Sequence, residues 1–134
     1  MRERACAVCL HEGAVLLILL KDPLSGRLMF SFPGGRIETG ERAAEAAVRE
    51  TAEETGYTIT TDPGPPFVLD YDYFWAGQWI SCQTHFFLAH KAGSQLFQPE
   101  GIICGHCWVT QKECHTYLED VFLRVLTHFF DDLS

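Results

Sequence analysis

Three glutamates lie close together in the chain, at positions 50, 53 and 54. In a helix, side chains three and four residues apart are neighbours on one face, so Glu50, Glu53 and Glu54 would present their carboxylates together. Like charges at this spacing destabilise a helix by about 0.2–0.5 kcal/mol per pair, so another interaction must offset the repulsion. Carboxylates are hard oxygen ligands that suit Mg²⁺ or Mn²⁺ and, through these ions, substrate phosphates. The spacing alone leaves a metal site and a solvated acidic face about equally open.

A helix is predicted from Gly40 to Thr55 around these glutamates. Thr39 can cap its first turn, and Gly56 can take the left-handed conformation that follows a last helical turn. At about 100° per residue, Ala43 and Ala46 fall beside the acids. A stripe of small residues falls on the opposite side: Ala44, Ala47, Val48, Thr51 and Thr55. We expect this stripe to pack on a sheet.

The residues around this helix form a longer pattern. Gly35 is followed by five residues, Glu41 and seven more residues, and then by the run Arg49-Glu50-Thr51-Ala52-Glu53-Glu54-Thr55-Gly56-Tyr57. Residues 35–57 resemble the complete Nudix box, the signature of the Nudix hydrolases, because every fixed residue of that pattern is present. The sequence departs from the pattern at Thr51 and Tyr57, where the family usually has a bulky aliphatic residue. These departures concern the packing of the helix and leave the acids in place.

The resemblance implies an α+β fold in which a mixed β-sheet is sandwiched between helices (α/β/α), with the box as a loop-helix-loop. It also implies that Glu50, Glu53 and Glu54 are the catalytic, metal-binding acids for Mg²⁺ or Mn²⁺, and that Glu50 orients or deprotonates the attacking water. The carbonyl oxygen of Gly34 is a further expected ligand. Glu100 stands where many relatives have an acid that faces the site, so it is a candidate ligand or base, with a surface glutamate as the alternative.

Four other residues of the box are expected to support its structure: Gly35, Glu41, Arg49 and Gly56. A carboxylate and a guanidinium form strong paired hydrogen bonds, so Glu41 and Arg49 can tie the loop to the helix.

The activity that the resemblance implies is hydrolysis of a nucleoside diphosphate linked to another group X. A diphosphate bridge carries clustered negative charge, so its hydrolysis depends on cations and on a water activated by metal. A nucleoside triphosphate, including oxidised forms, is the first choice of substrate, because the chain is little longer than the minimal fold. An ADP-sugar or a dinucleoside polyphosphate remains open. A catalytically silent, nucleotide-binding Nudix-like module is the alternative to an enzyme, and the three retained acids favour the enzyme.

Beyond the box, apolar, β-branched and aromatic segments predict strands near residues 3–10, 14–20, 28–33, 66–75, 79–89 and 102–109. A second helix is predicted from Tyr117 to Phe130, where apolar residues recur at helical spacing. It is expected to be structural, with its apolar face on the sheet.

Aromatic side chains gather around a predicted hairpin: Tyr71, Tyr73, Trp75, Trp79 and Phe86. Most of them are expected in the core. One or two can stack on a nucleobase, since such contacts are worth about 1–3 kcal/mol in single-strand binders.

The chain of 134 residues, 47% of them hydrophobic, has the size of one compact domain, so we expect residues 1–134 to form a single domain. Its formal net charge of −8 argues against a general attraction to nucleic-acid polymers or anionic membranes, so the expected partner is a small, nucleotide-type substrate.

No apolar run is long enough for a signal peptide or a membrane span, which predicts a cytoplasmic protein. The sequence leaves open whether the chain is a monomer or a homodimer.

The six cysteines include two pairs, Cys6 with Cys9 and Cys104 with Cys107, that superficially match a four-cysteine zinc site. Side chains three residues apart on a strand point to opposite faces, so Cys6 and Cys9 cannot hold one ion together. We therefore expect reduced thiols that pack as small hydrophobes, and a zinc-stabilised scaffold is the weaker alternative.

Overall fold

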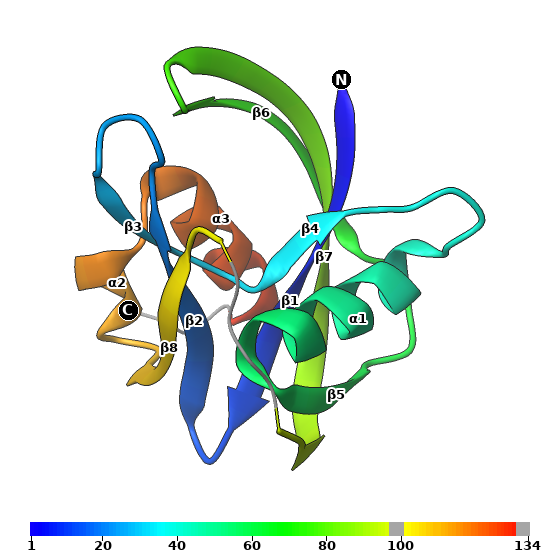
Figure 1. The fold of residues 1–134 in the computed structure, drawn as a ribbon. Helices are drawn as coiled ribbons and strands as arrows, with labels where there is room; N and C mark the ends of the chain where they lie inside the picture. The colour runs from blue at the N-terminus through cyan, green and yellow to red at the C-terminus, as the bar shows by residue number, and fades with distance from the viewer. Residues whose placement is uncertain (97–100, 131–134) are drawn as a thin grey trace.

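The computed structural model describes residues 1–96 and 101–130 of the chain (Figure 1). Glu100, the candidate further ligand, lies outside the described residues. The strands are β1 (Arg2–His11), β2 (Ala14–Lys21), β3 (Leu28–Ser31), β4 (Gly34–Arg36), β5 (Tyr57–Thr61), β6 (Phe67–Trp75), β7 (Gln78–Ser94) and β8 (Ile103–Thr110). The helices are α1 (Ala43–Thr55), α2 (Cys114–Tyr117) and α3 (Asp120–Phe129).

All eight of these strands belong to one mixed sheet, which is strongly twisted (Figure 1). Its main path runs β3-β2-β1-β7-β5, while β4 pairs with β1, β6 with β7 and β8 with β2. Strands β1 and β7 are parallel from the pair Arg2–Cys82 to the pair Leu10–His90. The other pairings are antiparallel. The sheet is therefore mixed, as predicted, with its parallel pair at the centre.

Alternate side chains of β1 enter two separate cores, as the two-residue period of a strand requires. Ala5, Ala7 and Cys9 pack with small residues of α1 on one face. Cys6 and Val8 pack with apolar residues of α3 on the other face. The sheet thus lies between α1 and α3, which confirms the predicted α/β/α sandwich, and Cys6 and Cys9 lie on opposite faces.

Helix α1 begins at Ala43 rather than at Gly40, so the predicted first turn is wrong. Thr39 does not cap the helix. The residue before the first helical turn is Arg42, whose extended backbone presents its N–H to Glu45 Oε1 at 2.9 Å. A glutamate in the third helical position that reaches back to the preceding N–H is half of a capping box, so Glu45 takes over part of the role that was assigned to the threonine.

The other end of α1 agrees with the prediction. Gly56 has a left-handed backbone, φ 78°, and its N–H donates to the carbonyl oxygen of Ala52 at 2.9 Å. The buried face is wider than the predicted stripe, because Ala46, placed beside the acids by its angle, is completely buried. Ala46 belongs to the same buried cluster as Ala5, Ala7 and Cys9 of β1, so this side of the helix also packs on the sheet.

The sequence prediction lacks three short elements: β4, β5 and α2. The predicted second helix also begins too early, since Leu118 is extended, with φ −95° and ψ 145°, and α3 begins only at Asp120. None of the helices in the described ranges is long and apolar enough to cross a membrane.

Candidate active site

Arg49 contacts both the loop before α1 and the acidic face of α1. Its Nε and Nη2 donate to the two carboxylate oxygens of Glu41 at 2.7 and 3.0 Å, and Nη2 also donates to the carbonyl oxygen of Arg36 at 3.0 Å. Its Nη1 donates to Glu50 Oε1 at 2.9 Å and to Glu53 Oε2 at 3.3 Å. The predicted pairing of Glu41 with Arg49 is present, and the same guanidinium offsets part of the repulsion among the helix acids. These hydrogen bonds lower the pKa of Glu41 to about 2.

The pKa values of Glu50 and Glu54 are displaced in the opposite direction. Glu54 Oε1 accepts a hydrogen bond of 2.8 Å from the N–H of Gly34. Burial nevertheless raises the pKa of Glu54 to about 8, and the negative charge of Glu50 adds to the rise. Burial also raises the pKa of Glu50, which the neighbouring Arg49 only partly opposes. Two desolvated carboxyls side by side disfavour their charged forms, and a bound cation would reverse that preference.

Two successive glycines allow the close approach of β4 to its neighbours. A Cβ atom at Gly34 would lie 2.3 Å from the carbonyl oxygen of Ala5 and 2.5 Å from Cys6 Sγ. A Cβ atom at Gly35 would lie 2.5 Å from Glu50 Cδ, and 2.7 and 2.8 Å from the two carboxylate oxygens. Gly34 therefore fits β4 against β1, whereas Gly35 leaves the space that the carboxylate of Glu50 occupies.

The donor chemistry of this helix face fits a hard divalent cation. Glu50, Glu53 and Glu54 supply carboxylate oxygens, the ligands that Mg²⁺ and Mn²⁺ prefer. In this structure the three carboxylates accept hydrogen bonds from the protein. Arg49 donates to Glu50 and Glu53, and the N–H of Gly34 donates to Glu54. Consistent with this, no three acidic, histidine or cysteine side chains within residues 1–96 and 101–130 are grouped closely enough to hold a metal ion. A cation would replace part of these contacts.

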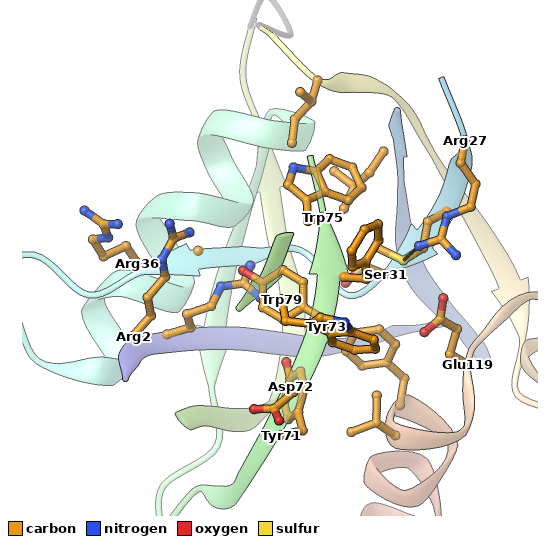
Figure 2. Close-up of a pocket in the computed structure, with 18 residues that line it drawn as sticks. Arg2, Arg27, Ser31, Arg36, Tyr71, Asp72, Tyr73, Trp75, Trp79 and Glu119 are labelled. Atoms are coloured by element: carbon orange, nitrogen blue, oxygen red, sulfur yellow. Dashed lines mark hydrogen bonds between the residues drawn. The ribbon is translucent and has the colours of Figure 1, made fainter. Parts of the chain in front are cut away.

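A cavity of about 540 Å³ opens beside the box, and Gly35 lies in its wall. Glu50, Glu53 and Glu54 do not line this cavity, and Gly35 is the residue that connects them to it, because the carboxylate of Glu50 packs on Gly35. Figure 2 shows basic side chains on two sides of the cavity, with Arg2 and Arg36 on one side and Arg27 on the other. Arg4 also belongs to the lining. Four guanidiniums in one cavity suit an anionic ligand, although the whole chain is acidic.

Aromatic side chains form much of the cavity between these arginines, as Figure 2 shows. Four members of the predicted aromatic cluster line it: Tyr71, Tyr73, Trp75 and Trp79. The fifth, Phe86, is completely buried in the core on the α3 side. Trp79 is 72% exposed, so its ring is accessible to a ligand. The cavity therefore offers flat aromatic surfaces next to cationic groups.

The sequence prediction did not include the four arginines of the cavity. They come from β1, from the turn between β2 and β3, and from β4, which are separate segments of the chain. Arg2 and Arg4 alternate along β1, which places these two on one face, but the predicted strand, residues 3–10, did not include Arg2. No sequence signal shows that Arg27 and Arg36 lie on the same cavity.

The fold and the box together define a Nudix domain. The NUDIX domain family matches residues 1–129, and the chain belongs to this family.

Two curated relatives illustrate the range of the family. The chain is 32% identical to a protein of Mycobacterium tuberculosis whose provisional name is mutator protein MutT4, over 92% of this chain and 49% of the relative. It is 46% identical to the ADP-sugar pyrophosphatase of Mus musculus over an alignment that covers 41% of this chain and 29% of the relative. The chain spans about half or less of the length of these two curated relatives.

A solved structure supports the fold over the full chain. The Ap4A hydrolase of Caenorhabditis elegans, in a binary complex, superposes with a TM-score of 0.71 and covers 98% of this chain and 96% of its own. Its sequence identity is 20%, so the likeness concerns the fold.

Proposed function

We propose that this chain is a metal-dependent pyrophosphohydrolase that cleaves a phosphoanhydride bond in a nucleoside diphosphate linked to another group. The first-choice substrate is a nucleoside triphosphate, oxidised or not, and a cytoplasmic location is part of the proposal. The observation that carries it is the place of Gly35, which lines a cavity with four arginines and an aromatic surface and also packs against the carboxylate of Glu50. The names of the relatives include an ADP-sugar pyrophosphatase and an Ap4A hydrolase, so the family likeness alone does not select the substrate.

In this proposal, the carboxylates of Glu50, Glu53 and Glu54 and the carbonyl oxygen of Gly34 hold Mg²⁺ or Mn²⁺. When bound, the ion supplies positive charge that neutralises the diphosphate oxygens and favours attack by water. Glu50 orients or deprotonates the attacking water. Its side chain is only 18% exposed, and burial raises its pKa, which is the direction that suits a general base. Arg49 fixes the position of that carboxylate by a hydrogen bond of 2.9 Å.

The cavity fits the two chemically distinct parts of a nucleotide. Arg2 and Arg36 lie on one side of it and can bind phosphate oxygens by charge-assisted hydrogen bonds (Figure 2). Trp75 and Trp79 can stack on the base, a contact worth about 1–3 kcal/mol per base. A triphosphate satisfies both sets of groups at once, and its scissile bridge then lies toward the acids of α1.

A substrate panel tests this proposal. Nucleoside triphosphates, 8-oxo-dGTP, nucleotide sugars and dinucleoside polyphosphates are incubated with the chain and Mg²⁺ or Mn²⁺, and phosphate and pyrophosphate are measured separately. We expect turnover of a triphosphate with release of pyrophosphate, and loss of turnover in excess chelator. Turnover of nucleotide sugars or dinucleoside polyphosphates alone would overturn the choice of substrate. Binding without turnover of any compound would identify a silent nucleotide-binding module.

A matched pair of variants locates the activity on α1. Glu53→Gln removes one of the proposed ligands, whereas Glu45→Gln removes an acid of the same helix that bonds to Arg42 at the helix start. We expect Glu45→Gln to keep the wild-type rate and Glu53→Gln to lose it. Equal rates in the two variants would exclude this helix face as the active site.

A further inference from the structure

Asp22 is a buried carboxylate outside the box, at the end of β2. Only 3% of this residue is exposed. Its Oδ1 accepts hydrogen bonds from the N–H groups of Leu24 at 2.8 Å and Ser25 at 3.1 Å, within the turn between β2 and β3. Its Oδ2 accepts a hydrogen bond of 3.0 Å from the N–H of Ala76, in the turn between β6 and β7. One side chain therefore joins two turns that are 54 residues apart in the sequence.

The two turns touch at a second point. A Cβ atom at Gly77 would lie 2.7 Å from Leu24 Cδ2, so the leucine packs directly over the glycine. In Figure 1 the β6–β7 hairpin arches toward the β2–β3 hairpin, in agreement with these contacts. We call the two contacts, Asp22 with Ala76 and Leu24 with Gly77, the turn–turn contact.

Both turns carry side chains of the substrate cavity. Arg27 lies at the end of the β2–β3 turn, and its carbonyl oxygen accepts a hydrogen bond of 2.8 Å from the N–H of Asp22. Trp75 precedes Ala76 and Trp79 follows the β6–β7 turn by one residue, and both line the cavity. Among the described strands, β3 pairs with β2 and β6 pairs with β7, so no strand pairing joins the β2–β3 hairpin to the β6–β7 hairpin. The turn–turn contact therefore connects the two cavity walls that these hairpins form.

The backbone conformation of Ala76 explains why the β6–β7 turn needs a contact from another part of the chain. Its φ is 51° and that of Gly77 is 80°, the left-handed pair of a two-residue hairpin turn. Alanine occupies this region at a cost that glycine does not have, so the native turn depends on the contacts that surround it. The carboxylate of Asp22 supplies such a contact to the N–H of the strained residue.

We propose that Asp22 is a positioning residue that fixes the β6–β7 turn, with Trp75 and Trp79, against the β2–β3 turn, with Arg27, and so sets the separation of the cavity walls around the substrate. This role rests on the proposed function, because the cavity is taken as the substrate site. Asp22 does not line the cavity and acts through the aromatic and arginine side chains, so it should affect substrate binding far more than the chemical step.

The variant Asp22→Asn tests this role with little change of shape. Its amide oxygen can retain the two N–H groups of the β2–β3 turn, and its amide nitrogen then faces the N–H of Ala76 and cannot accept from it. We expect hydrogen exchange at the Ala76 amide to accelerate about tenfold or more, with the Glu12 amide of the β1–β2 turn, φ 50°, as an internal reference. For dGTP with Mg²⁺, we expect KM to rise about tenfold with kcat within about twofold of the wild type.

Ser25→Ala is the matched control. Ser25 Oγ accepts a hydrogen bond of 3.2 Å from the N–H of Arg27, so its loss disturbs the β2–β3 turn without reaching Ala76. We expect exchange at Ala76 and KM to remain as in the wild type. Unchanged exchange at Ala76 in Asp22→Asn, or faster exchange with an unchanged KM, would overturn the role of Asp22. Absence of dGTP turnover in the wild-type chain would instead contradict the proposed substrate. The exchange measurement would still test whether Asp22 holds the β6–β7 turn through the Ala76 amide.

Discussion

Arg49 divides the acids of the box into two kinds. Glu41 receives two hydrogen bonds from the guanidinium, and its pKa falls to about 2, as expected for an acid whose role is an ion pair. Burial raises the pKa values of Glu50 and Glu54 instead. Acids that are kept from ionising easily inside a fold are candidates for a functional role. The direction of the pKa displacement thus separates the supporting acid Glu41 from two of the proposed ligands, Glu50 and Glu54.

The two proposed roles, metal ligand and structural support, predict opposite consequences for two substitutions of glutamate by glutamine. The side chain of Glu53 is 58% exposed, so Glu53→Gln loses only an exposed ion pair with Arg49, worth about 0.3–0.5 kcal/mol. We expect the free energy of unfolding in chelator to change by no more than this amount. We expect turnover to fall about 100-fold or more. Thermal melts in chelator and initial rates in Mg²⁺ on the same protein provide the two measurements.

Glu41→Gln is the contrasting variant. It removes a carboxylate that binds Arg49 through both oxygens, so we expect a lower melting temperature and only an indirect loss of activity. A melting temperature equal to that of the wild type would show that this ion pair does not support the box.

The raised pKa of Glu54 predicts how stability depends on pH in the absence of metal. The folded-state pKa is about 8 and the ordinary value is 4.5, so the folded chain binds more protons than the unfolded chain between these pH values. Stability contributed by the protonated carboxyl is therefore fully present below about pH 4.5 and is lost as the pH rises toward 8, by at most about 1.4 kcal/mol per pH unit. Unfolding in chelator at several pH values should show this decline in the wild type and a flatter profile in Glu54→Gln. Parallel profiles in the two proteins would contradict it.

At the scale of elements, β4 connects the sheet to the acidic helix through two glycines with different neighbours. The Cβ of Gly34→Ala would meet a backbone oxygen of β1, so the strand must move, and we expect a loss of stability of about 1–3 kcal/mol. The Cβ of Gly35→Ala would meet only the flexible end of Glu50, which can turn aside. We therefore expect Gly35→Ala to fold with near-normal stability and to lose about 10–100-fold in kcat. Urea unfolding measures the loss of stability, and steady-state rates measure the loss of kcat. Equal losses of stability in Gly34→Ala and Gly35→Ala would show that the side chain of Glu50 does not move away from the added Cβ.

The same elements show what the sequence can predict. The glycine that ends α1 and most strands follow from local spacing, because capping and alternation act over a few residues. The Glu41–Arg49 pair follows instead from the resemblance of residues 35–57 to the Nudix box. Strand β4 does not follow from local spacing, since three residues without a β-branched side chain form a strand only through their pairing with β1. Likewise, Ala46 is completely buried in the same cluster as Ala5 and Ala7 of β1, although its angle around the helix places it beside the acids.

At the scale of the whole molecule, the cavity was the least predictable feature. Its basic and aromatic residues are far apart in the sequence and meet because β1 lies between β4 and β7 and because the β6–β7 hairpin curves over the sheet (Figure 1). Register and curvature of this kind depend on the complete set of strand pairings, which no single segment encodes. The box locates the acids, whereas the sheet determines which side chains face the substrate.

The two cores on opposite faces of the sheet predict that Cys6 and Cys9 act independently. Cys6 lies in the core on the α3 side and Cys9 in the core on the α1 side, both completely buried. We expect Cys6→Ala and Cys9→Val each to cost packing-scale stability, about 1–3 kcal/mol, because each changes the volume of one core. Residues three apart on a strand are separated by about 10 Å. The loss of unfolding free energy in the double variant should therefore equal the sum of the losses in the two single variants within about 0.5 kcal/mol. Urea unfolding of the three variants, with metal analysis of protein purified without chelator, provides the test. Stoichiometric zinc that is lost together with the fold in either single variant would show that the cysteines form a metal site and that the two faces are linked through it.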